Sequence, residues 1–312
     1  MPFALVADIG GTNTRVALAD GEAIQKGSVE RFRNVDNAGL APVLEAYLSS
    51  KGLSAADIDG VCVDIAGPVQ DGVGTLTNLD WRVDKNVLRD SLGATRVAVL
   101  NDLQAQGHAL GRIAEADMIR VIAQPDASEN AAKLVINLGT GFNAVPVFDT
   151  EFGRFVPPSE AGHVSLPAAL PDLLPHLGVL CDRDGYPAVE EVLSGRGVSK
   201  VHAALHGEDL APGDVLDGIA AGDTAALATG RLFVKVFGDV ASALALHHLP
   251  FGGIYVVGGV IRHFTPHLNT LGFPEAFQAK GRFSRFIGRF GVTVVTDDYA
   301  ALRGCAAHLA RL

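Results

Sequence analysis

Residues 4–18 read ALVADIGGTNTRVAL, which is an apolar strand, a polar turn with two glycines, and a second strand. Residues 134–145 read LVINLGTGFNAV and repeat this pattern, with Gly139 in the place of Gly10. In each copy the first strand ends on a polar residue, Asp8 or Asn137, before a turn rich in glycine and threonine. Glycines let the backbone approach a ligand closely, and successive turn N–H groups form a concavity that suits anions. The doubled pattern predicts two half-domains that grip one polyphosphate between them.

Length and composition indicate a globular protein with room for two domains. The chain has 312 residues, of which 48% are hydrophobic and 19% are charged, so it can bury a large core. Its formal net charge of −10 argues against a nucleic-acid surface and for a protein that handles small molecules. No apolar run approaches the ~18 residues of a membrane span. The chain starts directly on its first strand, so we expect no signal peptide and no DNA-binding extension.

The cysteines add no metal or disulfide framework. Cys62, Cys181 and Cys305 are widely spaced and form no C-x-x-C pair. We therefore expect three free thiols and a cytoplasmic location, where thiols stay reduced.

Strand and helix patterns alternate along the chain. Strands are predicted at residues 5–9, 15–18, 60–65, 74–77, 96–100, 118–122, 254–257 and 292–296, with a strand pair at 134–148. Helices are predicted at residues 40–53, 84–92, 103–110, 198–205, 224–249 and 300–309, and the stretch 157–180 is predicted to be mostly loop. Asp84 is the expected N-cap of its helix, and the helix at 224–249 is long and apolar enough to lie in a core. This alternation predicts a mixed α/β fold.

The first turn carries more polar side chains than a β-hairpin needs, because two residues are enough for a hairpin turn. Its residues are Asp8, Gly10, Gly11, Thr12, Asn13 and Arg15. A carboxylate beside a phosphate is repulsive unless a divalent cation or its waters stand between them. Asp8 therefore indicates Mg²⁺, and Thr12, Asn13 and Arg15 are predicted to donate to phosphate.

The second turn formally matches a dinucleotide-binding pattern. Gly139, Thr140 and Gly141 are followed by Ala144, as in G-x-G-x-x-A, and Glu160 lies at a suitable distance downstream. That pattern requires a helix after the glycines, whereas Pro146 falls where the helix would be. We therefore expect a strand here and no dinucleotide site. The chain also lacks the G-x-x-x-x-G-K-[ST] pattern of a P-loop.

Asn101 and Asp102 follow the predicted strand at 96–100 and begin a helix. An Asp in this place is often only an N-cap. However, ligands of α/β sheets bind beyond the carboxyl ends of strands. Asp102 is therefore also a candidate to take a proton from an attacking hydroxyl, with Asn101 orienting the same substrate.

Further polar residues lie on predicted loops. Glu160 and His163 flank a glycine and are candidates to hydrogen-bond the hydroxyls of a polyol. They make a weak metal site, because no third ligand is near in sequence. Glu190 is a carboxylate just before a predicted helix. The pair Gly258-Gly259 either packs tightly after a buried strand or lets a flat adenine lie against the backbone.

Taken together and in this order, these segments resemble the bacterial glucokinases of the hexokinase–actin–heat-shock-70 ATPase superfamily, over essentially the whole chain. The resemblance implies an α/β, two-domain actin-like ATPase (ribonuclease H-like) fold with an active-site cleft between the domains. A small domain would span 1–102 plus 298–312, and a large domain 103–297. Segments 8–15 and 137–144 resemble the two phosphate motifs, and 256–260 resembles the adenosine motif. Helices 103–110 and 300–309 resemble the pair that connects the domains, with Gly304 at a position that is usually small.

The resemblance also implies the activity and its residues. It implies phosphorylation of glucose at O6 by ATP and Mg²⁺, the first step of glucose use in glycolysis, by a chain that is often a homodimer. Glucose would be bound by Asn101, Asp102, Glu160, His163 and Glu190, with Asp102 as the catalytic base and Glu191 as a bystander. ATP would be bound by Asp8, Gly10, Gly11, Thr12, Asn13, Arg15, Gly139, Thr140, Gly141, Gly258 and Gly259.

The chain departs from the family pattern in the second phosphate motif. Small residues usually stand where Asn137 is found, and Leu-Gly where Phe142 and Asn143 are found, so these changes are expected to alter nucleotide affinity or choice. The chain lacks the cysteine-rich zinc motif of the related repressor/open-reading-frame/kinase group, which places it with the zinc-free glucokinases.

Three other readings remain open from sequence. The first is a kinase for mannose, fructose or an N-acetylhexosamine. The second is a sugar sensor that does not turn over ATP, against which Asp102 argues. The third is a filament-forming or chaperone-type ATPase, which would have no need of Asn101, Glu160, His163 and Glu190.

Overall fold

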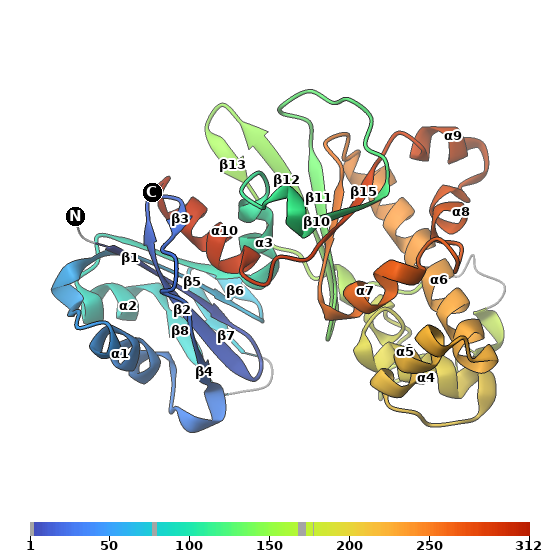
Figure 1. The fold of residues 1–312 in the computed structure, drawn as a ribbon, viewed down its shortest axis with the longest axis horizontal. Coiled ribbons are helices and arrows are strands. Elements are labelled where there is room, and N and C mark those ends of the chain that lie inside the picture. Colours follow the sequence, from blue (N-terminus) through green and yellow to red (C-terminus); the bar gives the residue numbers. More distant parts are fainter. Residues whose placement is uncertain (1–2, 77–79, 168–172, 177) are drawn as a thin grey trace. The chain divides into compact units, whose positions relative to one another are not determined.

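The computed structural model describes residues 3–76, 80–167, 173–176 and 178–312 (Figure 1). Its contacts divide the chain into two compact units. The first comprises Met1–Ala114, Phe152–Pro158 and Asp297–Leu312, and the second comprises Glu115–Glu151 and Ser159–Thr296. The sequence predicted a boundary at 102, whereas these contacts keep the following helix with the first unit.

The first unit is built on a mixed sheet whose first strand leads into the first glycine turn. In spatial order its strands are β3 (Ala23–Ile24), β2 (Asn13–Asp20), β1 (Phe3–Ile9), β5 (Ile58–Ile65) and β9 (Arg96–Asn101), with β4 (Glu30–Arg33) paired to β2. β1 is antiparallel to β2 and parallel to β5, and β5 is parallel to β9. The carboxyl ends of β1, β5 and β9 therefore meet at one edge, where ligands of α/β proteins bind.

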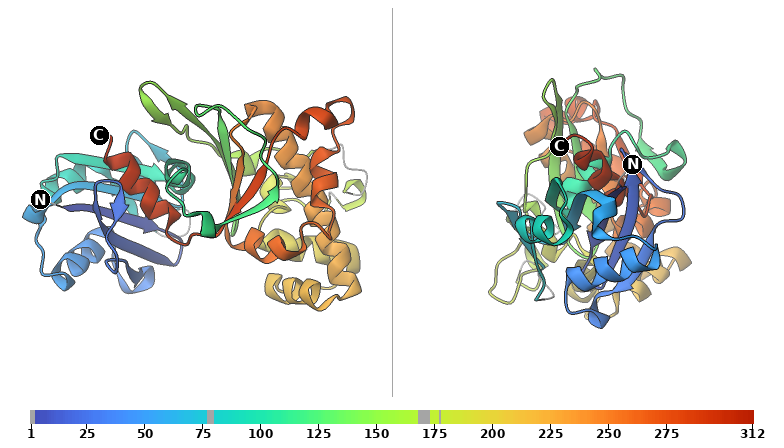
Figure 2. Two further views of the ribbon diagram at one scale, coloured as in Figure 1. Left: turned by 45° about the horizontal axis from the view of Figure 1, so that its top comes forward. Right: turned by 90° about the vertical axis from the view of Figure 1, so that its left-hand side faces the viewer.

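Two pairs of helices cover the two faces of this sheet (Figure 1). They are α1 (Leu40–Ser50), α2 (Lys85–Leu92), α3 (Asp102–Ala109) and α10 (Ala300–Leu309). α1 and α2 pack against the face that contains Leu5 and Ile9. α3 and α10 pack against the face that contains Val6, and Figure 2 shows α10 crossing it. Because side chains alternate along a strand, Asp8 lies on the face of α3 and α10.

The close approach of α3 and α10 depends on Gly304. A Cβ atom built on Gly304 would lie 1.7 Å from the backbone oxygen of Ala105 and 3.1 Å from the backbone nitrogen of Ala109. No side chain fits at such distances, so the small residue expected at this crossing is needed for packing. The neighbouring Cys305 is fully buried against the sheet.

The second unit is built on another mixed sheet. Within this unit its order is β10 (Met118–Ile122), β15 (Val292–Val295), β14 (Ile254–Val257), β11 (Lys133–Leu138) and β12 (Phe142–Thr150). The short strand β13 (Gly153–Phe155), which pairs with β12, is assigned to the first unit by its contacts. β11 is antiparallel to β12 and parallel to β14. The turn after β11 and the glycine pair after β14 therefore lie at the same edge of this sheet.

In the described part of the second unit, several helices accompany the sheet. They are α4 (Gly195–His206), α5 (Pro212–Ala221), α6 (Thr224–His248), α7 (Gly259–Phe264), α8 (Phe273–Gln278) and α9 (Ser284–Ile287). Phe233 and Phe237 of α6 are each 1% exposed and lie in the main apolar cluster of the unit. Figure 1 shows α6 running between α8 and α4, with which it makes many contacts. The prediction that this helix belongs to a core is confirmed.

Most predicted elements agree with the structure within a few residues at their ends. Asp84 is the N-cap of α2, accepting from the backbone N–H of Asn86 at 2.9 Å. The short strands β3, β4, β6 (Val69–Gln70), β8 (Arg82–Asp84) and β13 were not predicted, nor were α5, α7, α8 and α9. The predicted strand at 74–77 corresponds to β7 (Val73–Thr75), and its last residue lies outside the described residues. So does part of the predicted loop at 157–180.

Within the part of the chain that the structure describes, Cys62, Cys181 and Cys305 form no disulfide with one another. Within the described part of the chain, none of the helices combines the length and the apolar character that crossing a bilayer requires.

The contact between α3 and α10 contains a buried pair of histidines. His108 is 5% exposed, and its ring centroid lies 4.4 Å from that of His308. Burial, with a further contribution from His308, lowers the pKa of His108 to about 3. A histidine in an unfolded chain titrates near pH ~6.5. Below that pH the unfolded chain takes up a proton that the folded protein does not, so stability falls as the pH drops from about 6.5 towards 3.

Replacing His108 should therefore reduce acid sensitivity. Between pH 6.5 and pH 4.5 the wild-type protein should lose up to roughly 2–3 kcal/mol of its free energy of unfolding through this group. His108→Gln should remove that part of the loss, whereas His263→Gln, at an exposed position, should keep it. Denaturant unfolding at the two pH values measures the difference. An equal loss in wild type and His108→Gln would contradict the expectation.

Candidate active site

The first glycine turn is held in shape by Asn34, a residue that the sequence did not single out. The backbone N–H of Gly10 donates to the carbonyl of Asn13 at 3.0 Å. The Asn34 side chain donates to the carbonyl of Gly10 at 2.7 Å and accepts from the Thr14 hydroxyl at 2.8 Å. Its own N–H donates to the carbonyl of Thr12 at 2.9 Å. Asn34 is only 2% exposed. Because it lies 24 residues after Gly10, no local sequence pattern connected it with this turn.

Asp8 and Arg15 face each other across the two strands of this turn. They are register partners in the β1–β2 ladder, and Arg15 Nη1 lies 3.1 Å from Asp8 Oδ2. Gly11 and Thr12 are exposed at the tip of the turn, and Asn13 is half-buried. The turn therefore presents backbone and side-chain donors beside one carboxylate, as expected of a phosphate site that includes a cation.

A second carboxyl group, Asp64, lies directly beside Asp8. Asp64 on β5 is the register partner of Asp8 and is fully buried. The Cys305 thiol donates to its Oδ2 at 3.3 Å, whereas its Oδ1 has no hydrogen-bond partner in the structure. Burial, then the charges of Asp8, Cys305 and Asp102, raise the pKa of Asp64 well above its usual range. A lone Asp in a buried apolar strand was the signal that could have pointed to this residue.

The residues around Asp8 fit a Mg²⁺ ion that is bound partly by the protein and partly by the phosphates of a substrate. Within the described residues no three His, Cys, Asp or Glu side chains are grouped so that they could hold a metal ion. Mg²⁺ typically keeps several waters and binds through one or two carboxylates plus substrate phosphates. Asp8, 17% exposed at its side chain and next to the turn donors, suits that mode.

Asn101 and Asp102 stand where β9 ends and α3 begins. Asn101 is the N-cap of α3: its Oδ1 accepts from the N–H of Leu103 at 3.0 Å, and its Nδ2 donates to the carbonyl of Gly67. Gln104 completes the capping box by accepting from the N–H of Asn101. Asp102 is the first helical residue and is half-buried, and its Oδ1 also accepts from Leu103 at 2.8 Å. The cap is thus Asn101, and the role of either residue in sugar binding stays a prediction.

In the second unit, three backbone segments meet around Gly139. The N–H of Gly139 donates to the carbonyl of Gly141 at 3.0 Å, and its carbonyl accepts from the N–H of Gly195 at the start of α4 at 2.9 Å. A Cβ atom on Gly139 would lie 3.6 Å from Gly258 Cα and from the nitrogen of Gly259. The expected strand after the turn is present as β12, so the dinucleotide reading is excluded.

Gly258 and Gly259 have different structural reasons to be glycine. Gly258 has a φ of +114°, and a Cβ there would lie 2.4 Å from the carbonyl oxygen of Leu138 and 2.7 Å from Oδ1 of Asn137. Gly259 is exposed, with nothing within 4 Å of the position that a Cβ atom would take. Thr140, at the tip of the other turn, is exposed as well. This edge therefore offers open backbone at Thr140 and Gly259 for a nucleotide.

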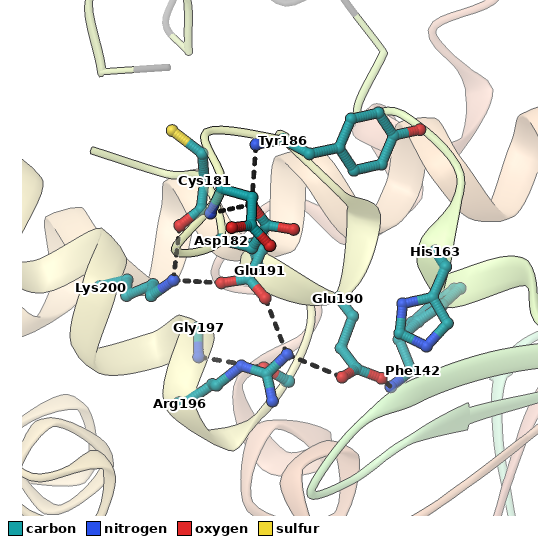
Figure 3. Close-up of polar contacts among 12 residues, drawn as sticks. Phe142, His163, Cys181, Asp182, Tyr186, Glu190, Glu191, Arg196, Gly197 and Lys200 are labelled. Atoms are coloured by element: carbon teal, nitrogen blue, oxygen red, sulfur yellow. Dashed lines mark hydrogen bonds and ion pairs between the residues drawn. The ribbon is translucent and has the colours of Figure 1, made fainter. Parts of the chain in front are cut away.

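Glu190 lies between the second turn and the loop that carries Glu160. Its Oε2 accepts from the backbone N–H of Phe142 at 3.0 Å (Figure 3). A Cβ on Gly141 would come within 2.5 Å of this oxygen, and one on Gly162 within 3.3 Å. Gly141 therefore leaves space for the present position of the carboxylate, and the backbone of Gly162 lies close to it.

Glu191 is not a bystander in structural terms. Figure 3 shows Arg196 between the two carboxylates, with Nη2 at 2.8 Å from Glu190 Oε1 and from Glu191 Oε1. Lys200 binds the other oxygen of Glu191. Burial would raise the pKa of Glu191, but its hydrogen bonds to Lys200 and Arg196 outweigh burial and lower it. Glu191 is thus an anchor for Arg196, which in turn holds Glu190. Glu190, Glu191 and Arg196 are close in sequence, but no sequence pattern indicated that Arg196 binds both carboxylates.

Glu160 interacts electrostatically with Glu190, and Figure 3 shows His163 on the same side of the second turn as Glu190. His163 Nε2 lies 4.0 Å from Glu160 Oε2, and both side chains are exposed. Partial burial and the charge of Glu190 raise the pKa of Glu160, while His163 opposes the shift. The second unit thus presents an imidazole and two carboxylates beside the turn at Gly139–Gly141, and such groups bind the hydroxyls of a polyol.

Comparisons with known proteins show the family of this chain. Residues 5–312 match the family model described as Glucokinase. The glucokinase of Erwinia tasmaniensis is 31% identical over 318 residues, covering 98% of this chain and 97% of that protein. A crystal structure of a glucokinase from an Antarctic psychrotroph has a TM-score of 0.86 at 29% identity and covers 99% of both chains. A ROK-family glucokinase from Streptomyces griseus, solved with glucose and AMPPNP, has a TM-score of 0.63 at 21% identity, over 98% of this chain and 99% of that one.

The fold and the two glycine turns define the class of protein as a two-domain, actin-like α/β sugar kinase. Within that class, the chain belongs to the glucokinase family. Membership of this family supports the ATP-dependent phosphorylation of glucose as its activity.

Proposed function

We propose that the protein transfers the γ-phosphate of ATP to O6 of D-glucose, giving glucose 6-phosphate and ADP, as the first step of glucose use in glycolysis. The observation that carries the proposal is the gathering of Glu160, His163 and Glu190 next to the Gly139–Gly141 turn. A filament-forming or chaperone-type ATPase has no use for such a group. The Streptomyces relative, which was solved with glucose and AMPPNP, supports the same pair of substrates here.

Asp102 is the proposed general base. It lies at the carboxyl end of β9, on the same sheet edge as the Asp8 turn. It would accept the proton of the C6 hydroxyl as that oxygen attacks the γ-phosphate, while Asn101 and the three residues of the second unit would hold the sugar. Catalysis of phosphoryl transfer is largely positioning and charge stabilisation, so one correctly placed carboxylate is the main chemical group that the chain must supply.

The phosphates of ATP are proposed to bind at the two glycine turns and the adenosine at Gly258 and Gly259. Thr12, Asn13 and Arg15 would donate to phosphate from the first turn, and Thr140 from the second. When bound at Asp8, Mg²⁺ would neutralise charge on the β- and γ-phosphates. Arg15, already within reach of Asp8, would keep that carboxylate oriented.

ATP turnover measured with and without glucose tests the proposal directly. We expect ADP release to depend on glucose and on added Mg²⁺, with glucose 6-phosphate as the product. A panel of mannose, fructose and N-acetylhexosamines in the same coupled assay would show which hexose has the highest kcat/KM. Turnover that is independent of any sugar, or sugar binding without turnover, would contradict the proposal. We also propose a cytoplasmic homodimer, and light scattering on a size-exclusion column tests the oligomeric state.

A further inference from the structure

Asn143 lies between the second glycine turn and the sugar loop, defined here as residues 159–163. It is the second residue of β12 and the register partner of Asn137 on β11. Its side chain is well buried, with the residue 9% exposed. The family pattern has a glycine in its place, and the sequence therefore suggested an effect on the nucleotide. The contacts of the side chain instead indicate an effect on the sugar loop.

Both ends of the Asn143 amide bind the backbone of the sugar loop. Nδ2 donates to the carbonyl of Ser159 at 2.6 Å, and Oδ1 accepts from the N–H of Ala161 at 2.9 Å. Oδ1 also accepts from the N–H of the next residue, Ala144, at 2.8 Å. The two loop contacts fall on either side of Glu160. The side chain therefore fixes the peptide groups that flank this carboxylate.

The sugar loop needs such a support. Glu160 is the N-cap position of a single 3₁₀ turn, Ala161–His163, and its side chain makes no capping hydrogen bond. Its carboxylate is 51% exposed, so burial of the side chain does not fix its direction. A Cβ on Gly162 would lie 2.1 Å from the carbonyl oxygen of Phe142, so the loop also lies tightly against the start of β12.

We propose that Asn143 is a positioning residue for sugar binding: its amide clamps Ser159 and Ala161 so that Glu160 points towards a hydroxyl of the bound hexose. The proposal rests on the proposed function, because it takes Glu160 to be a glucose ligand. Asn143 does not touch the sugar itself in this arrangement. It acts on the sugar through the loop, to which its side chain makes two hydrogen bonds.

Asn137 provides the contrast on the neighbouring strand. Its Oδ1 lies towards the two nucleotide-side glycines, at 2.7 Å from a Cβ built on Gly258 and 3.3 Å from one built on Gly139. The two asparagines are register partners. Asn143 nevertheless binds the sugar loop, whereas Asn137 lies near Gly139 and Gly258. Their replacement should therefore affect different substrates.

The test compares Asn143→Ala with Asn137→Ala in the full chain, by measuring KM for glucose and KM for ATP separately. Asn143→Ala leaves the partly buried carbonyl of Ser159 and the partly buried N–H of Ala161 without their partner, and we expect KM for glucose to rise about tenfold. Its KM for ATP should stay within about twofold of wild type, because uncoupled sites respond independently. Asn137→Ala should show the opposite pattern. Asp149→Asn, which breaks an ion pair with Lys133 further along β12, is the matched control and should change neither constant.

A second variant keeps the shape of the side chain. Asn143→Asp retains the acceptor for Ala161 but replaces the donor to Ser159 by an oxygen, so KM for glucose should rise again. This variant covers the case in which Asn143→Ala does not fold. Unchanged KM values for glucose in both variants would overturn the proposal, as would an equal rise in both constants, which would indicate a general loss of structure. If the wild-type protein shows no glucose-dependent turnover, the proposed function itself is overturned. Failure of the positioning role and failure of the proposed function are therefore distinguishable.

Discussion

Replacing Asp102 by alanine is expected to lower kcat with glucose by about 10²–10⁴-fold, the usual loss when a general base is removed. The helix that starts at this residue should survive the change. The N–H of Leu103 donates to Asp102 and also to the N-cap Asn101 at 3.0 Å. The start of α3 therefore keeps its N-cap when Asp102 is replaced. The effect should therefore fall on catalysis, with glucose binding retained.

Two variants separate the role in catalysis from the role in the fold. Asp102→Asn keeps the shape of the side chain but removes the basic carboxylate, so its kcat should fall as far as that of Asp102→Ala. Asp84→Ala removes a true N-cap, that of α2, and should cost about 1 kcal/mol of stability with little change in kcat. Calorimetric titration with glucose measures binding in each variant. Near-normal turnover in Asp102→Ala would remove the assignment of this residue as the base.

Gly304→Ala should destabilise the first unit strongly. The added methyl group would fall 1.7 Å from the backbone oxygen of Ala105, and backbone atoms cannot rotate out of the way as a side chain can. We expect a loss of at least about 1–3 kcal/mol, the usual cost of overpacking. Since α3 would be displaced with Asp102 at its start, turnover should fall in the protein that still folds.

Gly213→Ala is the matched control for this helix glycine. Gly213 lies in the first turn of α5, and nothing lies within 4 Å of the position that its Cβ would take. Alanine favours the helix over glycine by roughly 0.5–1 kcal/mol, so this variant should be neutral or slightly stabilised. Thermal unfolding of both variants measures the contrast. Equal melting temperatures for Gly304→Ala and the wild type would show that the α3–α10 contact has room for a methyl group, against this expectation.

The sequence was a good guide to elements that follow a regular hydrophobic period. β10, β14 and α10 were predicted with their observed bounds, because each is a clear apolar or amphipathic run between turn residues. The short strands β3 and β6 were missed, since two residues carry no period. α7 was missed because it directly follows Gly258 and Gly259 and is six residues long.

The parts of the candidate site that sequence could not predict depend on contacts between distant residues. Asn34 supports the first turn from outside it, and no local pattern marks such a brace. Arg196 links Glu190 to Glu191 because it lies in the first turn of α4. The start of that helix is positioned by the hydrogen bond from Gly195 to Gly139. Asn143 was noticed as a departure from the family pattern, but the direction of its side chain required the structure.

Under the proposed function, the tight packing of Gly162 also limits where the sugar preference of this protein can evolve. A methyl group at position 162 would lie 2.1 Å from the backbone oxygen of Phe142, which cannot rotate aside, whereas one at position 141 would meet only the flexible end of the Glu190 side chain. Changes in sugar preference are therefore expected at exposed positions beside this glycine, such as His163 of the sugar loop and Val164 just after it, which is 54% exposed. Drift in substrate preference should thus concentrate on the outer side of the loop, because its inner side packs against the start of β12.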